Sequence, residues 1–418
     1  MSNPSPPPFF DVRMRGFPTR TEVDDAVALI RDRVQPLGSE LVELDAAAGR
    51  VLAGGVVATV PVPHFDRAAF DGYAVRAEET FGAGPYNPVT LRIVGEAMPG
   101  RAFGRPVAAG EAVRIMTGSP MPAGADAVLP AESAEEIGGL LRVVEPVVPH
   151  KNVGRTGEDV PLGRNVLRAG RVLRPQDLGL LSSIGGGRVE VVRRPRVVIL
   201  VTGDEILPPG SKPEGFRIVD SNSVVLRALV RRDGGELLPT QHLPDRPDAI
   251  RAAMTAGGWD VLLVSGGTSV GREDHAPRLV AELGELLVHG MALRPASPAG
   301  FGFIGGRPVF LLPGNPVSCL CAYDLFAGRA VRRLGGRSDD LPYRFAEYLA
   351  AGKIVSAVGR VDYVRLRLTP AGVEPIAVSG ASILSTTVVA DGFTLVPRDR
   401  EGYAPGDRVP VFLYDSTV

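Results

Sequence analysis

The chain has 418 residues, which is more than one hydrophobic core usually organises, so we expect three or four domains. With 44% hydrophobic and 22% charged residues, it has the composition of a folded globular protein and not of an intrinsically disordered one. The 46 Lys and Arg residues are balanced by 47 Asp and Glu residues, so no global field attracts nucleic acid or an anionic membrane. A local anion site is compatible with this balance.

The cysteines and the first residues of the chain indicate a compartment. Cys319 and Cys321 are too close in sequence for an ordinary structural disulfide or a zinc knuckle, which favours a reducing cytosol. Met1 to Phe10 is proline-rich without the regions of a secretion signal, and no run of about 18 apolar residues occurs. We therefore expect a cytoplasmic protein that does not span a membrane. The histidines show no metal spacing and are interpreted as structural or surface residues: His64, His150, His242, His275 and His289.

In chain order, the first predicted element is an amphipathic helix over Thr21 to Val34, where apolar residues recur at three- and four-residue steps. Between about Val51 and Pro149, short alternating runs separated by Gly and Pro indicate a small β domain without a long helix. Those runs are Val89 to Val94, Ala112 to Met116 and Leu140 to Val144. A short helical stretch follows at Leu178 to Ile184.

From Arg196 to about Leu334, apolar strands alternate with helical segments, which predicts a mostly parallel, doubly wound sheet. The expected strands are Arg196 to Val201, Gly235 to Leu238, Val261 to Val264 and Val309 to Leu312, and the expected helices are Ser223 to Arg232, Pro247 to Ala256, Ala276 to Leu283 and Pro316 to Leu334. Val355 to Val411 returns to short strands and predicts a small β barrel or sandwich.

Four polar motifs follow predicted strands of the α/β segment directly, and open α/β sheets bind ligands at that end of their strands. They are V-T-G-D-E (Val201 to Glu205), V-S-G-G-T-S-V-G-R-E-D (Val264 to Asp274), L-P-G-N-P-V-S (Leu312 to Ser318) and Asp245 in L-P-D-R-P. Their small residues allow close approach of the backbone to a phosphate or a pterin. Several carboxylates beside anion-binding loops indicate Mg²⁺ bridging protein and phosphate oxygens.

Each motif has a simpler interpretation. A single glycine-rich loop is more often only a tight turn, Asp204 could cap a helix, and Asp245 could be a turn residue. Three loops at successive strand ends are harder to explain in this way. The G-x-S-x-G nucleophile elbow and the G-x-x-x-x-G-K-[ST] phosphate loop are both missing from the sequence, so hydrolase and P-loop functions lose support.

The N-terminal third carries further acidic clusters that are ordinary turn chemistry when taken one by one. They are F-D-R-A-A-F-D-G-Y-A-V (Phe65 to Val75), R-I-M-T-G-S-P-M-P-A-G-A-D-A-V-L (Arg114 to Leu129) and G-R-T-G-E-D-V (Gly154 to Val160). Together with T-G-D-E, S-G-G-x-S-x-G-x-x-D and L-P-G-N-P-V-S, and in this order, they resemble the molybdopterin molybdenumtransferase family, which includes bacterial MoeA and the E domain of gephyrin. The resemblance spans roughly Thr21 to Val411.

This resemblance implies a multidomain α/β plus β fold. Its expected parts are an elongated linker and dimerisation domain (1–50 and 150–190), a small β domain (51–149), a molybdopterin-binding-like α/β domain (191–338) and a C-terminal β-barrel domain (339–418). It also implies a homodimer in which the α/β domain of one subunit faces the small β domain of the other across a cleft. Transient contacts with the pterin adenylyltransferase and with apo-molybdoenzymes are further expected, and neither nucleic acid nor a membrane is an expected partner.

The implied reaction inserts molybdate into adenylylated molybdopterin and releases AMP with Mg²⁺ as cofactor. The candidate catalytic residues are Asp66, Asp159, Glu205, Asp245 and Asp274, of which Glu205, Asp245 and Asp274 are the candidate metal ligands. The candidate substrate-binding residues are Thr117, Thr202, Gly203, Ser265, Gly266, Gly267, Ser269, Arg294, Pro313, Gly314, Asn315, Pro316 and Arg365.

The sequence departs from the family pattern in the expected oxyanion pocket. Where the family commonly has K-P-G-K-P, this chain has Arg294-Pro295-Ala296-Ser297-Pro298, and Gly290 and Ala381 stand at the positions of a further family Lys and a family Ser. Arg can still hold an oxyanion, through two hydrogen bonds. These changes leave tungstate as an alternative metal. They also leave two rival functions, a non-catalytic pterin-binding scaffold paralog and a pterin adenylyltransferase, which shares only the α/β domain.

Overall fold

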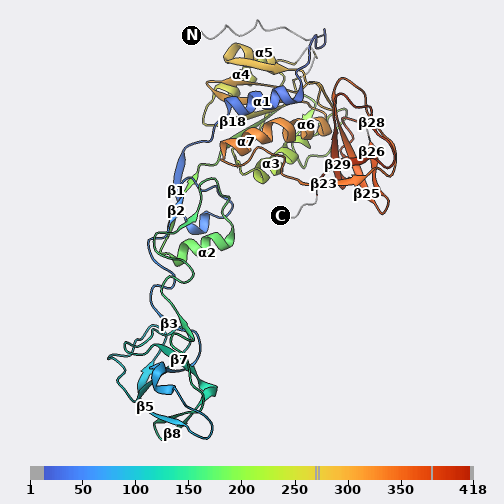
Figure 1. Ribbon diagram of the computed structural model, residues 1–418. Coiled ribbons are helices and arrows are strands. Elements are labelled where there is room, and N and C mark those ends of the chain that lie inside the picture. Colours follow the sequence, from blue (N-terminus) through green and yellow to red (C-terminus); the bar gives the residue numbers. More distant parts are fainter. Residues whose placement is uncertain (1–13, 269–270, 272–273, 378–379, 415–418) are drawn as a thin grey trace, which may run out of the picture. The chain divides into compact units, whose positions relative to one another are not determined.

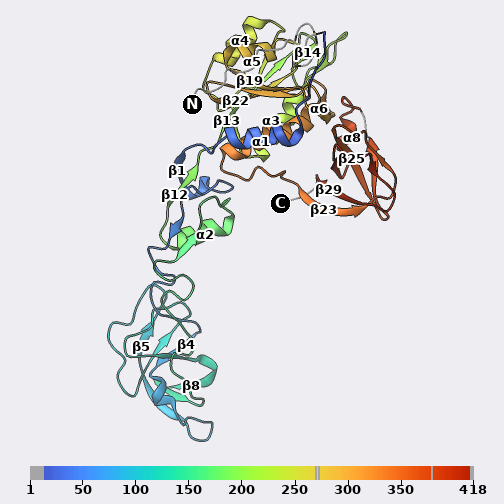
Figure 2. The ribbon, with the colours of Figure 1, turned by 45° about the horizontal axis from the view of Figure 1, so that its top comes forward.

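The computed structural model describes residues 14–268, 271, 274–377 and 380–414. These residues form two compact units (Figures 1 and 2). Among the described residues, the first unit comprises those up to Glu40, Gly49–Val51 and those from Val191 onward, and the second comprises Leu41–Ala48 and Leu52–Glu190. Within the described ranges, no helix is long and apolar enough to cross a membrane.

A seven-stranded sheet forms the centre of the first unit. Its strand order is β16-β13-β18-β22-β21-β19, and β17 also pairs with β13. Strands β13, β16, β17, β18 and β22 pair in parallel, whereas β21 pairs antiparallel with both β22 and the edge strand β19. Their bounds are β13 Arg196–Thr202, β16 Glu236–Leu237, β17 Gln241–Leu243, β18 Val261–Ser265, β19 Glu285–His289, β21 Gly300–Ile304 and β22 Arg307–Leu312. The prediction of a mostly parallel α/β sheet is confirmed.

Helices cover both faces of this sheet because β13 alternates its apolar side chains between them. Val197, Ile199 and Val201 share one core with α1, α3, α6 and α7, while Val198 and Leu200 share the other with α4 and α5. These helices span α1 Val23–Arg33, α3 Asn222–Arg232, α4 Pro247–Thr255, α5 Ala276–Leu283, α6 Pro316–Ala322 and α7 Gly328–Leu334. Each fully buried Val or Ile contributes about 2 kcal/mol to folding. Proline stands in the first turn of α4, α5 and α6, where no N–H donor is needed.

The predicted helix Pro316 to Leu334 is not uniform. Between α6 and α7 it passes through a π-helical segment, Tyr323–Ala327, whose residues are all buried. Such a wide turn is a common feature near functional regions. Here it places Asp324 at the centre of a polar network inside the first unit, although no ordinary helix periodicity distinguishes that position from its neighbours.

The C-terminal β domain is a six-stranded sheet of order β20-β25-β27-β29-β23, with β26 paired to β25. Its strands are β20 Leu293–Arg294, β23 Arg344–Leu349, β25 Val361–Thr369, β26 Gly372–Ala377, β27 Gly392–Val396 and β29 Arg408–Leu413, with β24 Ile354–Val355 and β28 Gly402–Tyr403 pairing beside it and a short helix α8 Ser385–Val388. Because β20 belongs to the α/β segment of the chain and pairs with β25, main-chain hydrogen bonds join the two domains.

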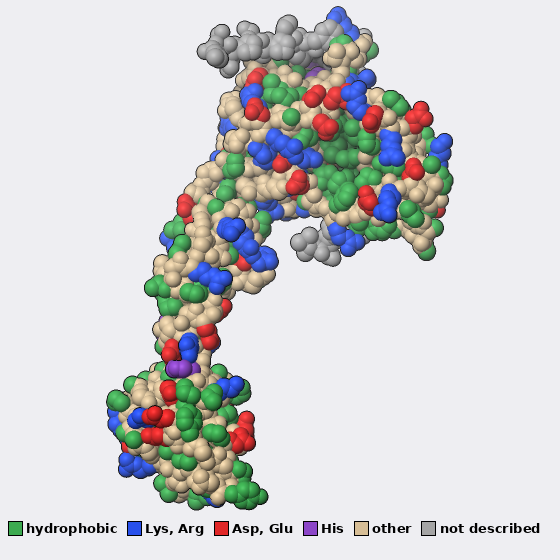
Figure 3. Space-filling view, viewed as in Figure 1, with side chains coloured by type: hydrophobic (Ala, Val, Ile, Leu, Met, Phe, Trp, Pro, Cys, Tyr) green, Lys and Arg blue, Asp and Glu red, His purple; other side chains and the backbone are tan. Residues whose placement is uncertain are grey.

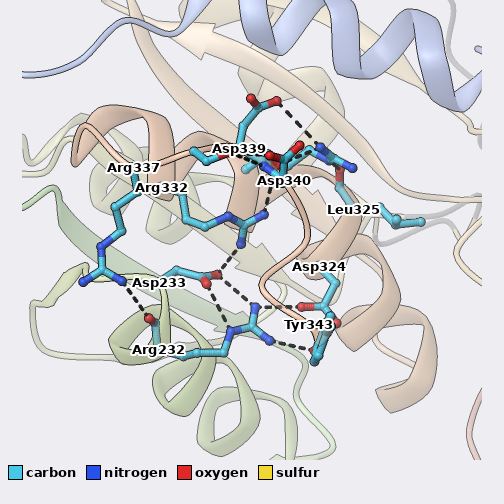
Figure 4. Close-up of polar contacts among 11 residues, drawn as sticks. Arg232, Asp233, Asp324, Leu325, Arg332, Arg337, Asp339, Asp340 and Tyr343 are labelled. Carbon is cyan, nitrogen blue, oxygen red and sulfur yellow. Dashed lines mark hydrogen bonds and ion pairs between the residues drawn. The ribbon is translucent and has the colours of Figure 1, made fainter. Parts of the chain in front are cut away.

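A buried ionic network makes a second attachment (Figure 4). Tyr343, which precedes β23, donates its hydroxyl to Asp324 Oδ2 at 2.8 Å and accepts from Arg232 Nη1 at 2.6 Å. Arg232 also pairs with Asp324 and with Asp233, and Arg332 pairs with Asp233 at 2.9 Å. Burial raises the pKa of Asp324, and Arg232 opposes that effect. The charges are matched in number, as buried charges must be to remain ionised.

The second unit contains a six-stranded sheet of order β7-β4-β6-β5-β9-β8. Its bounds are β4 Gly72–Val75, β5 Val89–Ala97, β6 Glu111–Ile115, β7 Ala127–Pro130, β8 Ala134–Ile137 and β9 Leu140–Val143. Its other elements are β2 Val56–Val57, β3 Arg67–Ala68, β10 Val153–Gly154, β11 Asn165–Leu167 and α2 Pro175–Ser183, with three short 3-10 turns. The boundary between the two units falls within the paired strands β1 Ser39–Glu43 and β12 Arg188–Val192. Asp177 fixes the start of α2 by accepting from the Arg174 N–H, and the Arg171 guanidinium lowers its pKa. On the face drawn in Figure 3, basic and acidic side chains are interspersed, in line with the balanced composition.

Candidate functional site

The loops at the carboxyl ends of β13, β17, β18 and β22 meet around a cavity of about 820 Å³. The parallel register brings them together, since Thr202 lies opposite Leu243 while Ser265 lies opposite Val201 and Leu312. All four motifs singled out in the sequence contribute to its wall. The candidate residues that line it are Thr202, Gly203, Glu205, Asp245, Ser265, Gly266, Gly267, Asp274, Gly314, Asn315 and Pro316. Ser269 lies outside the described residues.

Glycine is required where the loop after β18 turns along the cavity. Gly266 has a φ of +92°, and a Cβ there would stand 2.4 Å from the carbonyl oxygen of Thr202. Its N–H donates to the Leu312 carbonyl at 3.3 Å, and the hydroxyl of Thr268 donates to the same carbonyl at 3.1 Å. These contacts hold the loop against β13 and β22, so that its backbone faces the cavity without side chains in the way.

The cavity wall is acidic. Glu205, Asp245 and Asp274 all line it, as does the buried Asp220. The loops after β13 and β17 are tied by reciprocal bonds: Asp204 N–H donates to Asp245 Oδ2, and Asp245 N–H donates to Asp204 Oδ1, each at 3.3 Å. Asp274 accepts from the N–H of Gly271, three residues before it. Carboxylates from separate loops therefore face one space.

This donor set fits a magnesium ion that is shared with a substrate. Among the described residues, no three Asp, Glu, His or Cys side chains are close enough to enclose a metal by themselves. Mg²⁺ rarely needs such a cage, because it usually takes one or two carboxylates and completes its shell with phosphate oxygens and water. Glu205, Asp245 and Asp274 supply oxygen donors of this kind around the cavity.

Two lining residues that sequence reasoning did not select are Asp220 and Asn222, on either side of the start of α3. Asn222 Nδ2 donates to Ser265 Oγ at 3.0 Å and to the Gly314 carbonyl at 2.8 Å, so it ties together the loops after β18 and β22. Its Oδ1 atom and Thr202 Oγ1 are buried without a hydrogen-bond partner. Buried polar atoms are normally paired, so these two can accept or donate to a bound ligand. The D-S-N sequence before an amphipathic helix was the available signal.

His242 and Cys319 lie behind the cavity wall and have structural contacts. His242 Nε2 pairs with Asp220 Oδ2 at 2.8 Å, and Asp220 Oδ1 accepts from the N–H of Ser223. Cys319 Sγ lies 3.9 Å from Ser265 Oγ, and burial raises the pKa of its thiol to about 12. A thiol of this kind is neutral at physiological pH and is therefore a poor nucleophile.

A second cavity, of about 330 Å³, lies between the α/β and C-terminal domains. The candidate residues Arg294 and Pro313 line it. Asn315 lines both cavities, so the L-P-G-N-P loop lies between the first cavity and the second. Arg365 lines neither cavity: it is 1% exposed and lies on β25 inside the C-terminal sheet. Arg360, five residues earlier, lines the second cavity instead. The sequence G-R-V-D-Y-V-R offers two arginines, and their pattern alone does not say which one faces outward.

The remaining candidates, Asp66, Thr117 and Asp159, lie in the second unit. Asp66 Oδ1 accepts from the N–H and the hydroxyl of Thr156, both at 2.7 Å, and these bonds lower its pKa. Thr117 donates from its N–H and its hydroxyl to Asp71 at 2.7 and 2.8 Å. Asp159 is exposed. The carboxylates of Asp66 and Asp71 are thus held ionised at the surface of this unit.

The fold and the two cavities define a class of multidomain α/β protein with a polar, glycine-lined cavity at the strand ends of its α/β domain. Three family models match successive parts of the chain, and they agree with this class of protein. Residues 21–185 match the MoeA N-terminal region (domain I and II), residues 198–333 match the model described as "Probable molybdopterin binding domain", and residues 349–414 match the MoeA C-terminal region (domain IV).

Relatives and solved structures agree with these matches. A molybdopterin biosynthesis protein of Methanocaldococcus jannaschii is 35% identical over 89% of this chain and 91% of its own, and molybdopterin molybdenumtransferase 2 of Mycobacterium tuberculosis is 37% identical over 72% and 76%. A crystal structure of the molybdopterin biosynthesis MoeA protein from Pyrococcus horikoshii is 31% identical, covers 95% of this chain and 100% of its own, and has a TM-score of 0.82. The chain belongs to the MoeA family.

Proposed function

We propose that this chain is a molybdopterin molybdenumtransferase of molybdenum cofactor biosynthesis, which inserts molybdate into adenylylated molybdopterin and releases AMP. The observation that carries the proposal is the cavity at the ends of β13, β17, β18 and β22, which combines a close backbone approach, unpaired buried polar atoms and carboxylates. A nucleotide-linked pterin needs all three features. The names of the curated relatives support the same activity.

Each part of the cavity has a role in this proposal. Gly266 and Gly267 allow the phosphates or the pterin to approach the backbone, and Asn222 and Thr202 offer the unpaired polar atoms. Glu205, Asp245 and Asp274 would hold Mg²⁺, which when bound would neutralise the charge of the pyrophosphate. A carboxylate that is not bound to metal can accept the proton of an attacking water.

The oxyanion is a substrate, and we place it in the second cavity beside Arg294, where a guanidinium can bind it through two hydrogen bonds. Molybdate is the proposed oxyanion and tungstate is the alternative. We further propose a homodimer in which Asp66 and Thr117 of one subunit complete the site of the other, as the family resemblance implies. Asp159 is proposed to line the same site. A reducing cytosol is the proposed compartment, and it is supported by Cys319 and Cys321, which are both free.

The rival functions have less support. A scaffold paralog has no need of four carboxylates around one cavity, although Ser297 and Gly290, which stand at family lysine positions, favour it. A pterin adenylyltransferase would use the α/β domain and leave the flanking regions without a role, yet both of those regions match MoeA models.

The test is release of AMP from adenylylated molybdopterin with Mg²⁺, in the presence of molybdate, tungstate or no oxyanion. We expect oxyanion-dependent release by the wild type, and a loss of about 100-fold or more in Glu205→Gln and in Asp274→Asn, because each removes a charge from the cavity wall. Glu214→Gln is the matched control, since Glu214 is exposed and does not line the cavity.

Binding of the pterin nucleotide without AMP release under any condition would replace the transferase with the scaffold. Full activity in both cavity variants, with their fold intact by circular dichroism, would remove the proposed role of these carboxylates.

A further inference from the structure

The segment before α1 covers the two positions at which this chain lacks the family lysines. Thr21 donates its N–H to the Gly290 carbonyl, and Ala292 donates its N–H to Thr21, so the segment runs beside the strand that leads into β20. The ring of Phe17 occupies the place of a side chain at Gly290, since a Cβ there would stand 2.6 Å from a Phe17 ring carbon. Gly290 also has a φ of +97°, which disfavours other residues. The loss of one lysine is therefore matched by the gain of an aromatic ring.

The second position carries a hydroxyl with a cation beside it. Ser297 lines the second cavity, and Arg20 Nε donates to Ser297 Oγ at 3.0 Å. A positive charge thus remains at the place of the missing lysine, but it is attached to a different part of the chain. Arg20 is exposed, so its guanidinium can turn toward an anion without loss of packing.

Two further guanidinium groups lie beside that of Arg20. Arg294 and Arg360 both line the cavity and both pair with Asp362, a fully buried carboxylate that also accepts from the Ser356 hydroxyl at 2.7 Å. Arg294 reaches Asp362 through Nη2, and Arg360 reaches it through Nε, which lies 3.6 Å from Asp362 Oδ1. A guanidinium has five N–H donors, so Asp362 holds both groups in position and leaves each with further donors for an anion. With Arg20 included, these groups leave two net positive charges, which suits a tetrahedral dianion.

We propose that Arg20 and Arg360 are specificity-determining residues of the oxyanion pocket, and that with Arg294 they bind a tetrahedral dianion in place of the lysines that this chain lacks. The inference rests on the proposed function for the place of the oxyanion. The inference adds which residues bind the oxyanion, and two of these, Arg20 and Arg360, lie outside the segment Arg294 to Pro298. Arginine forms directed pairs of hydrogen bonds, whereas lysine acts as a point charge, so the pocket selects by geometry as well as by charge.

Binding is measured directly, by titrating the full chain with sodium molybdate, sodium tungstate or sodium sulfate in a calorimeter at low salt. We expect Arg20→Ala and Arg360→Ala each to weaken molybdate or tungstate binding by about tenfold, because each removes a charge-assisted hydrogen bond. Arg367→Ala is the matched control, because Arg367 lies on the same strand as Asp362, is exposed and does not line the cavity. Adding Ser297→Lys to the Arg20→Ala variant should restore binding.

Binding that is unchanged in Arg20→Ala and Arg360→Ala would overturn the inference, and so would a wild type that binds none of the three anions. Failure of Ser297→Lys to restore binding would also overturn the claim that Arg20 replaces a charge at that position. AMP release is measured separately. A chain that binds the oxyanion through these arginines but releases no AMP would contradict the proposed function and leave this inference standing.

Discussion

Two glycines in the wall of the first cavity differ in whether the structure has room for a side chain at their position. Gly266 has a left-handed φ and has no room for a Cβ beside the Thr202 carbonyl, whereas a Cβ on Gly314 would meet only Gly266 Cα, at 3.9 Å. We therefore expect Gly266→Ala to cost about 2 kcal/mol or more and to lower the melting temperature by several degrees. Gly314→Ala, from the facing loop, should melt within about a degree of the wild type. Equal melting temperatures for the two variants would contradict this account of the loop.

At the same scale, the sequence predicts the position of a residue along a strand better than the direction of its side chain. Glu205, Asp245 and Asp274 could be placed together, because parallel strands deliver their following loops to one edge. The choice between Arg360 and Arg365 depends on how β25 enters its sheet, and no local pattern shows this. Asn222 was missed for a related reason: its partners, Ser265 and Gly314, lie on loops far away in the sequence.

At the scale of elements, the regular alternation of strands and helices could be predicted from the sequence, whereas its interruptions could not. Apolar strands such as β13 and β18 are buried on both faces and have a plain signature. The antiparallel edge strands β19 and β21 were not predicted, because Gly300 and Gly302 dilute the strand pattern of β21. Those glycines are needed because β19 passes so close that a Cβ would stand 2.5 and 2.1 Å from its carbonyl oxygens. The π-helical segment had no signal either, since it serves the tertiary contacts of Asp324.

The ionic network drawn in Figure 4 should contribute to the stability of the junction between the α/β and C-terminal domains. Tyr343→Phe keeps the aromatic contact with Phe393 but removes the hydroxyl that bonds Asp324 and Arg232. A buried carboxylate then lacks one donor, so we expect a loss of about 1–3 kcal/mol and a lower melting temperature. Tyr86→Phe is the control, because Tyr86 is fully exposed. If Tyr343→Phe has the same melting temperature as the wild type, the network does not stabilise the junction of the two domains.

For the whole molecule, the proposed dimer makes a quantitative prediction. If the small β domain of one subunit completes the cavity of the other, Asp66→Ala and Glu205→Gln damage different halves of the same composite site. Each homodimer should be inactive. In a mixed dimer, one site carries both lesions and the other carries neither.

Random mixing of the two variants should therefore restore about a quarter of wild-type AMP release, since half of the dimers are mixed and each has one intact site. AMP release is measured on the co-expressed mixture, and again on mixed dimers that are purified from it through two different affinity tags. Mixed dimers without activity would show that Asp66 and Glu205 act within one subunit. An active Asp66→Ala homodimer would show that Asp66 has only its local role of binding Thr156. Recovery to about half of wild-type activity per purified mixed dimer would place the two carboxylates in one site built from two chains.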